Sequence, residues 1–162
     1  MADKYHVRLE KEQLIFSAAH FITFDGDTCE RLHGHNYRVM AEVRGSLDEN
    51  HYVIDFIALR DTLQEITSEL DHQMLLPTEH DQIQVVAVES EVQVSFQDRR
   101  WVFPLDDCVL LPLANTTTEL LAHYIGRQLV ERLEKRLGHR PDHVTIGVDE
   151  NEGQWGICEL EI

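Results

Sequence analysis

The stretch HFITFDGDTCERLHGHNYRV, residues 20–39, is the part of this sequence that most restricts its fold and its chemistry. It contains three histidines, His20, His33 and His35, and one cysteine, Cys29. Residues two apart in a strand point to the same face, so the Cα atoms of His33 and His35 would lie about 6.5–7 Å apart. Two imidazoles at that spacing can both reach one ion at the Zn–N distance of about 2.0–2.1 Å.

The segments on either side of this stretch alternate between apolar and polar residues, which predicts two strands, over residues 5–20 and 35–44. His20 ends the apolar row of the first strand and could supply a third nitrogen beside His33 and His35. Three neutral histidines with one vacant position describe a catalytic zinc site. An H-x-H pair also occurs by chance, so on this pattern alone a hydrogen-bonded structural role for the histidines stays open.

The remaining segments complete an α+β domain. Residues 56–70 and 115–138 have apolar residues at helical spacing, and residues 143–162 form two strands joined by a turn. We predict one domain over residues 1–162: a four-stranded antiparallel sheet with two helices on one face. The β-branched segment around residues 83–103 is predicted to be an inserted hairpin or set of extra strands.

The composition excludes several kinds of partner and location. A formal charge of −16 argues against nucleic acid, whose phosphates are bound by clustered Lys and Arg. No apolar run of about 18 residues is present, so we expect no membrane-spanning helix. The first residues, MADKYHVRLEKEQ, lack an apolar signal segment, and a cytoplasmic protein is expected. Three widely spaced cysteines make neither a disulfide framework nor a CxxC zinc module.

Six motifs resemble one known family, and they occur in that family's order. They are FSAAH, CERLHGHNYRV, VIDFIALR, LDHQML, TTTE and VTIGVDEN, between residues 16 and 151. The family comprises the 6-pyruvoyltetrahydropterin synthases and the related 6-carboxytetrahydropterin synthases of queuosine biosynthesis.

The resemblance implies a role for each matching position. It implies zinc bound by His20, His33 and His35, a catalytic base at Cys29, proton transfer completed by Asp71 and His72, a pterin anchor at Glu150, and a pterin pocket lined by Thr117, Thr118 and Glu119. Arg31 is the basic residue nearest to the histidines on a suitable side, and we expect it to contact the triphosphate of the substrate. Arg38 lies on the opposite strand face from His35 and is a weaker candidate.

Two glutamates among these also have interpretations based on local sequence. Val144, Ile146, Val148 and Glu150 alternate, so Glu150 would continue a buried row, where a carboxylate needs N–H donors such as those of a pterin. Its alternative is an exposed strand end. Glu119 follows Thr116 by three residues, which is the spacing of a helix-capping box.

The resemblance implies a zinc-dependent lyase acting on 7,8-dihydroneopterin triphosphate. Cys29 stands four residues before His33, and this short spacing favours the branch that releases triphosphate and acetaldehyde to leave 6-carboxy-5,6,7,8-tetrahydropterin. The alternatives are a 6-pyruvoyltetrahydropterin synthase acting on the same substrate and a non-catalytic relative that binds zinc and pterin.

The family also implies an assembly, the tunnelling fold. Three subunits close a barrel and two such trimers stack, so a homohexamer with active sites at subunit boundaries is expected. Three features depart from the family pattern: Leu120 follows the Thr-Thr-Glu sequence, the 83–103 segment lengthens the chain, and the acidic balance is unexpected for a family whose substrate carries a triphosphate.

Overall fold

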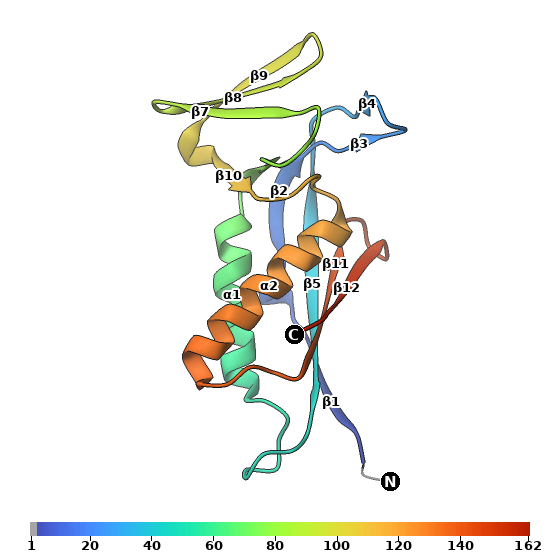
Figure 1. The fold of residues 1–162 in the computed structure, drawn as a ribbon, viewed down its shortest axis with the longest axis vertical. Coiled ribbons are helices and arrows are strands. Elements are labelled where there is room, and N and C mark those ends of the chain that lie inside the picture. Colours follow the sequence, from blue (N-terminus) through green and yellow to red (C-terminus); the bar gives the residue numbers. More distant parts are fainter. Residues whose placement is uncertain (1–2) are drawn as a thin grey trace.

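The computed structural model describes residues 3–162 as an α+β fold with two long helices and twelve strands. The elements in chain order are β1 (Tyr5–Glu10), a 3-10 turn (Glu12–Leu14), β2 (Phe16–His20), β3 (Thr23–Phe24), β4 (Thr28–Cys29), β5 (His33–Gly45), α1 (Phe56–Leu70), β6 (Gln73–Pro77), β7 (Gln84–Val88), β8 (Glu91–Phe96), β9 (Arg99–Pro104), a 3-10 turn (Leu105–Asp107), β10 (Cys108–Leu111), α2 (Thr118–Leu137), β11 (His143–Asp149) and β12 (Trp155–Leu160). Both helices lie on one face of the main sheet, as predicted (Figure 1).

The 13-residue strand β5 is the centre of this sheet. Its first half pairs antiparallel with β2, and its second half pairs with β1 on one side and β11 on the other. The full strand order is β10-β6-β2-β5-β11-β12. Residues of β5 therefore connect the two ends of the molecule, and its N-terminal end carries the histidine pair.

The predicted strand over residues 5–20 is two strands, β1 and β2. Glu10 pairs with Met40 and Phe16 pairs with Tyr37, so the five residues between Glu10 and Phe16 lie opposite only two residues of β5. A 3-10 turn takes up the excess and places the side chain of Leu14 in the core, fully buried. Alternation alone did not distinguish this interrupted ladder from a continuous strand.

The predicted four-stranded antiparallel sheet is present, and two short strands extend it. β6 pairs in parallel with β2, and β10 pairs in parallel with β6. No helix within residues 3–162 has the length and hydropathy needed to cross a membrane.

Capping interactions define the helix starts and show one difference from prediction. Asp55 caps α1, since its carboxylate accepts from the amides of Ile57 at 2.7 Å and Ala58 at 3.3 Å. The cap of α2 is Thr117, which accepts from the Leu120 amide, so the capping box predicted from Thr116 and Glu119 is wrong. The helix is capped one residue later than predicted because the Thr116 carbonyl accepts a hydrogen bond from His20, as described below.

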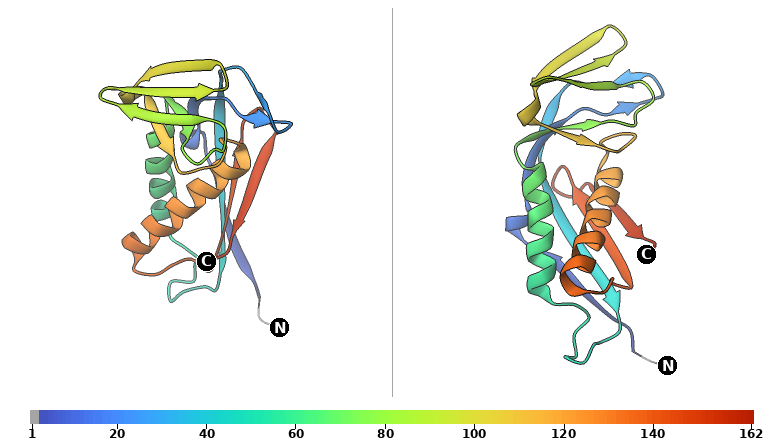
Figure 2. Two further views of the ribbon diagram at one scale, coloured as in Figure 1. Left: turned by 45° about the horizontal axis from the view of Figure 1, so that its top comes forward. Right: turned by 60° about the vertical axis from the view of Figure 1, so that its left-hand side comes forward.

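The 83–103 segment forms a separate three-stranded antiparallel sheet, β7-β8-β9, which confirms the predicted extra strands. It lies at the end of the molecule opposite the N-terminus and next to the β3–β4 hairpin (Figures 1 and 2). Its inner face packs against β6 and against the residue that follows β2. The contact is a second apolar cluster, formed by Phe21, Met74, Leu76, Ile83, Val92, Val94 and Phe96. The segment thus has its own core and covers the region that follows His20.

Candidate metal centre and active site

Strand pairing brings the three histidines together. His20 of β2 pairs directly with His33 of β5, and Ala18 pairs with His35. The three side chains therefore share one sheet face, and the small side chain of Ala18 leaves room beside His35. Their ring centroids lie 4.8–5.3 Å apart. Gly34 makes the close packing of the strands possible, because a Cβ there would lie 3.2 Å from the Ala18 carbonyl oxygen.

The hydrogen bonds of two of these rings leave a nitrogen free to bind a metal. His20 Nδ1 is 2.9 Å from the Thr116 carbonyl oxygen, and His33 Nδ1 is 2.7 Å from the Arg31 carbonyl oxygen. A carbonyl only accepts, so Nδ1 carries the proton and Nε2 presents its lone pair, the arrangement that outer-shell partners impose on metal-binding histidines. His20 Nε2 is buried and has no hydrogen-bond partner within the described residues.

The electrostatics of His20 favour a ligand over a charged group. Burial lowers its pKa to about 4, and the neighbouring rings of His33 and His35 act in the same direction against the hydrogen bond to Thr116. His20 is therefore neutral near pH 7, the form that coordinates a metal. The candidate ligand atoms of the three histidines all lie within 4.8 Å of one another. Nitrogens around a tetrahedral zinc are roughly 3.3 Å apart, so small side-chain rotations suffice for binding.

Two glutamates flank this cluster. A carboxylate oxygen of Glu150 is 3.9 Å from His35 Nε2, and one of Glu30 is 3.6 Å from His33 Nε2. Glu30 is firmly held, because its carboxylate accepts from the Ile22 amide at 2.8 Å and its own amide donates to the Ile22 carbonyl. The sequence analysis did not consider Glu30, although its place directly after Cys29 was a usable signal.

Tyr37 is a second residue beside the cluster to which the sequence analysis gave no role. It follows His35 by two positions, so it continues the same row, and its ring centroid is 5.4 Å from that of His35. Its hydroxyl is buried without a hydrogen-bond partner within residues 3–162. Burial raises the pKa of Tyr37, and the nearby Glu150 and Glu30 raise it further, so the hydroxyl is a proton-bearing donor facing the cluster.

Cys29 ends the β3–β4 hairpin that precedes the histidine pair. It is half-buried and packs against the second apolar cluster. Burial raises the pKa of its thiol, and Glu30 adds to this, whereas the guanidinium of Arg99 lowers it. Within the described residues, the surroundings of Cys29 therefore favour the neutral thiol, and only Arg99 beside it favours the thiolate.

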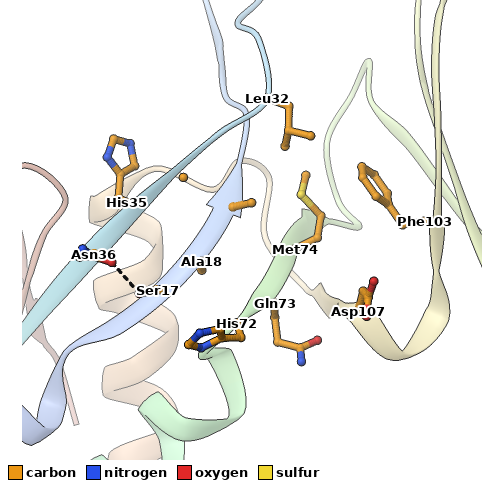
Figure 3. A pocket seen from close by; sticks show the side chains of 12 residues that line it. Ser17, Ala18, Leu32, His35, Asn36, His72, Gln73, Met74, Phe103 and Asp107 are labelled. Carbon is orange, nitrogen blue, oxygen red and sulfur yellow. Dashed lines mark hydrogen bonds between the residues drawn. The ribbon is translucent and has the colours of Figure 1, made fainter.

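Asp71 and His72 form a pair, but the chain does not bring this pair to the histidine cluster. His72 Nδ1 is 2.8 Å from one oxygen of Asp71, whose other oxygen accepts from the Ser17 amide at 2.8 Å. Ser17 and its partner Asn36 alternate with the residues that bear the histidines, so they face the opposite side of the sheet. There His72 lines an open hollow of about 600 Å³ with Gln73, Asp107 and the apolar residues Leu32, Met74 and Phe103 (Figure 3).

The other predicted site residues lie around the start of α2 and the β4–β5 connection. Thr117 is the helix cap, and the Thr118 hydroxyl donates to the exposed carboxylate of Glu119 at 3.2 Å. Arg31 is exposed, and its carbonyl accepts from His33. Arg38 bonds to Asp149 on the opposite face from His35, as its strand position predicted.

Comparisons with known proteins agree with this geometry. The family model described as 6-pyruvoyl tetrahydropterin synthase matches residues 9–161. The chain belongs to that family. It is 31% identical to a Methanocaldococcus jannaschii protein provisionally named 6-carboxy-5,6,7,8-tetrahydropterin synthase, over 90% of this chain and 88% of that protein.

Two of the solved structures that match are 6-pyruvoyltetrahydropterin synthases from Plasmodium. A Plasmodium falciparum 6-pyruvoyl tetrahydropterin synthase superposes with a TM-score of 0.91 and 32% identity, over 99% of this chain and all of that one. A Plasmodium vivax 6-pyruvoyltetrahydropterin synthase superposes with a TM-score of 0.90 and 30% identity over the same shares. Coverage this complete means that the 83–103 segment is not peculiar to this member of the family.

The turn that carries Glu150 in this synthase-family chain is organised by a buried acid that the sequence analysis did not single out. Asp149 is 1% exposed, whereas the Glu150 side chain is 31% exposed. Both faces of β11 are buried, so the predicted single buried row ending at Glu150 is only half of the strand. The Asp149 carboxylate accepts from Arg38 and from the amides of Asn151, Gly153 and Gln154.

We predict that Asp149→Asn lowers the free energy of unfolding by about 3–5 kcal/mol, because it leaves Arg38 and several amides without a buried anion. Burial alone would raise the pKa of Asp149, but the amides and Arg38 outweigh it and hold the pKa below its usual value. A depressed folded pKa stabilises the protein above the unfolded pKa of about 3.9, and this contribution is lost as the pH falls through the folded value.

Urea unfolding of both proteins between pH 7 and pH 3 tests this prediction, and the difference should narrow below about pH 4. Glu152→Gln is the matched control, because Glu152 is exposed in the same turn. Equal stability of Asp149→Asn and the control at pH 7 would contradict the assigned role.

Proposed function

We propose that this chain is a zinc-dependent lyase that converts 7,8-dihydroneopterin triphosphate to 6-carboxy-5,6,7,8-tetrahydropterin, with loss of triphosphate and acetaldehyde. The observation that carries the proposal is the buried, unpartnered Nε2 of His20 facing His33 and His35. A buried polar atom without a partner costs free energy, and a metal ion bound by three imidazoles would satisfy it. Three ligands leave a position for substrate hydroxyls, whose pKa a bound zinc lowers.

The residues around the metal would bind and deprotonate the substrate. Glu150 would accept the 2-amino group and N3–H of the pterin, since a carboxylate forms two parallel bonds with such a fork. Cys29 would take a proton from the side chain of the substrate as general base. Thr117, Thr118 and Glu119 would border the pterin, and Arg31 would contact the triphosphate. With this chemistry the protein would serve queuosine biosynthesis.

A second base candidate has support from the structure. Glu30 lies beside Cys29 and 3.6 Å from His33, with its carboxylate fixed by the Ile22 amide. In the P. vivax synthase, variants exist in which a glutamate described as a catalytic residue is replaced by alanine or by cysteine. We therefore keep the pyruvoyl product, with Glu30 as the base, as the alternative function.

The metal assignment predicts one zinc per subunit in protein purified without added metal. His33→Ala/His35→Ala should lose the zinc because one imidazole alone cannot hold it, whereas His123→Ala, on the exposed side of α2, should retain it. Elemental analysis of the three proteins measures this. Zinc that persists in the double variant would show that the metal is bound elsewhere.

The product is tested by mass spectrometry after incubation with dihydroneopterin triphosphate, with an acetaldehyde assay in parallel. We expect the 6-carboxy compound and acetaldehyde, and a decrease in kcat on the order of 10²–10⁴-fold in Cys29→Ala, the usual worth of a general base. Glu30→Gln should have the smaller effect. A pyruvoyl product without acetaldehyde, lost in Glu30→Gln, would establish the alternative, and zinc binding without turnover would indicate a non-catalytic relative.

The position of Asp71 and His72 bears on the assembly. The pair lies on the sheet face opposite the histidines, at the open hollow. If it completes proton transfer, it does so for a site on another copy of the chain, as expected for active sites at subunit boundaries. We propose that the open sheet edges pair between three copies to close a barrel and that two trimers stack.

This assembly predicts a hexamer in light scattering at micromolar concentration. Mixing Cys29→Ala with His72→Ala subunits should restore part of the activity that each variant has lost, because some mixed sites contain both wild-type groups. A monomer, or no recovery in mixtures that exchange subunits, would contradict a shared site.

A further inference from the structure

The hairpin that carries Cys29 is held mainly by the 78–115 region. Its own strands, β3 and β4, have two residues each, which is too few for independent stability. Arg99 Nη1 donates to the Cys29 carbonyl at 2.9 Å, and Gln97 Nε2 donates to the Asp27 carbonyl at 3.4 Å. At the other strand of the hairpin, the Asn115 side chain donates to the Thr23 carbonyl at 3.2 Å.

A further contact fixes the orientation of Thr23. His80 Nδ1 accepts from the amides of Gln82 and Ile83, so its proton is on Nε2, which lies 2.7 Å from the Thr23 hydroxyl. The hairpin is thus attached at both of its strands to residues that precede, form and follow the three-stranded sheet. Figure 2 shows this sheet directly beside the hairpin in both views.

Arg99 is itself fixed in place by aromatic stacking. Its guanidinium lies 4.7 Å from the centre of the Trp101 ring, and Trp101 stacks on Phe21 at 4.6 Å. Phe21 follows the ligand candidate His20 in sequence. A guanidinium over an aromatic face is favourable and keeps its orientation. Within residues 3–162, Arg99 forms no ion pair with a carboxylate, so its charge is not neutralised by a neighbouring acid.

The charge of Arg99 acts on the Cys29 thiol. Burial is the largest effect and raises the pKa of Cys29, and Glu30 raises it further. Arg99 opposes both by its charge, and its hydrogen bond to the Cys29 carbonyl keeps that charge beside the residue. Because a guanidinium stays protonated at every accessible pH, this opposition is permanent.

We propose that Arg99 is a positioning residue for Cys29: it anchors the cysteine hairpin to the three-stranded sheet and holds a permanent positive charge beside it. This inference rests on the proposed function, in which Cys29 is the base. It assigns a role to the 83–103 segment, which the sequence analysis treated only as an insertion. Arg99 acts through Cys29 and is not proposed to contact the substrate.

The test measures the reactivity of the thiol directly. Zinc-loaded wild type, Arg99→Gln, Arg99→Lys and Arg100→Gln are treated with iodoacetamide between pH 6 and pH 10, and alkylation of each cysteine is followed by peptide mass spectrometry. Arg100 is the matched control, because it is the next residue, is exposed, and loses the same charge. Cys108 and Cys158 are internal controls in every sample.

In Arg99→Gln we expect Cys29 to be alkylated on the order of 10-fold more slowly near pH 8, with its pH midpoint shifted upward by about one unit. Arg99→Lys, which keeps the charge but not the planar donor pair, should fall between wild type and Arg99→Gln. Arg100→Gln should match wild type. With dihydroneopterin triphosphate, Arg99→Gln should lower kcat more than it changes KM.

Three outcomes would overturn the inference. Unchanged Cys29 alkylation in Arg99→Gln would remove the positioning role while leaving the synthase proposal intact. Parallel changes at Cys29 and Cys108 would indicate general loosening of the segment. An equal effect of Arg100→Gln would indicate net charge alone. A different outcome separates the two proposals. If wild-type protein shows no turnover while Cys29 alkylation still depends on Arg99, the proposed function is refuted and the positioning role is kept.

Discussion

The pairing of β2 with β5 is the constraint on which the site depends. His20 lies directly opposite His33, so the distance between two candidate ligands is set by the sheet itself. A shift of one residue in this register would turn His20 to the other face, away from His33 and His35. The close approach of Gly34 to the Ala18 carbonyl oxygen limits such a shift, since the strands at this point leave little room for a side chain. The convergence of the three histidines is therefore a consequence of β-sheet geometry more than of loop conformation.

The start of α2 is tied to the same centre. The Thr116 carbonyl accepts from His20 Nδ1, and Thr116 is completely buried just before the helix begins. Gly156 of β12 allows the helix to sit this deep, because a Cβ there would lie 2.4 Å from the Thr118 hydroxyl and 2.6 Å from the Glu119 amide. The Thr116 carbonyl thus fixes the proton of His20 on Nδ1 instead of accepting a helical amide, and the helix is capped at the next residue, Thr117.

Much of the fold could be predicted from short-range patterns, and the failures have physical causes. The helix over 56–70 and the convergence of His20, His33 and His35 follow from periodicities of 3.6 and 2 residues, and the structure confirms both. The division of residues 5–20 into two strands and the burial of Asp149 depend on which strands pair with one another. The periodicity of a single segment carries no information on that pairing. Arg99 bonds to Cys29, a partner 70 residues away, so no local motif could mark it. Glu30 has a local signal, its place directly after Cys29, but its fixed orientation depends on the pairing with Ile22.

The arginines of this acidic chain divide into those that form ion pairs and those that do not. Arg38 is bonded to Asp149, and Arg132 and Arg140 form ion pairs with Glu69 and Glu134. Within the described residues Arg31 and Arg99 form no such pair, and both lie beside the cysteine hairpin and the histidines. A triphosphate carries several negative charges, and one exposed arginine cannot neutralise them in a chain of formal charge −16. Under the proposed function, a bound metal and cations of a neighbouring copy of the chain would supply the remaining positive charge. This is a second argument, besides the position of Asp71 and His72, for the proposal of a site shared between subunits.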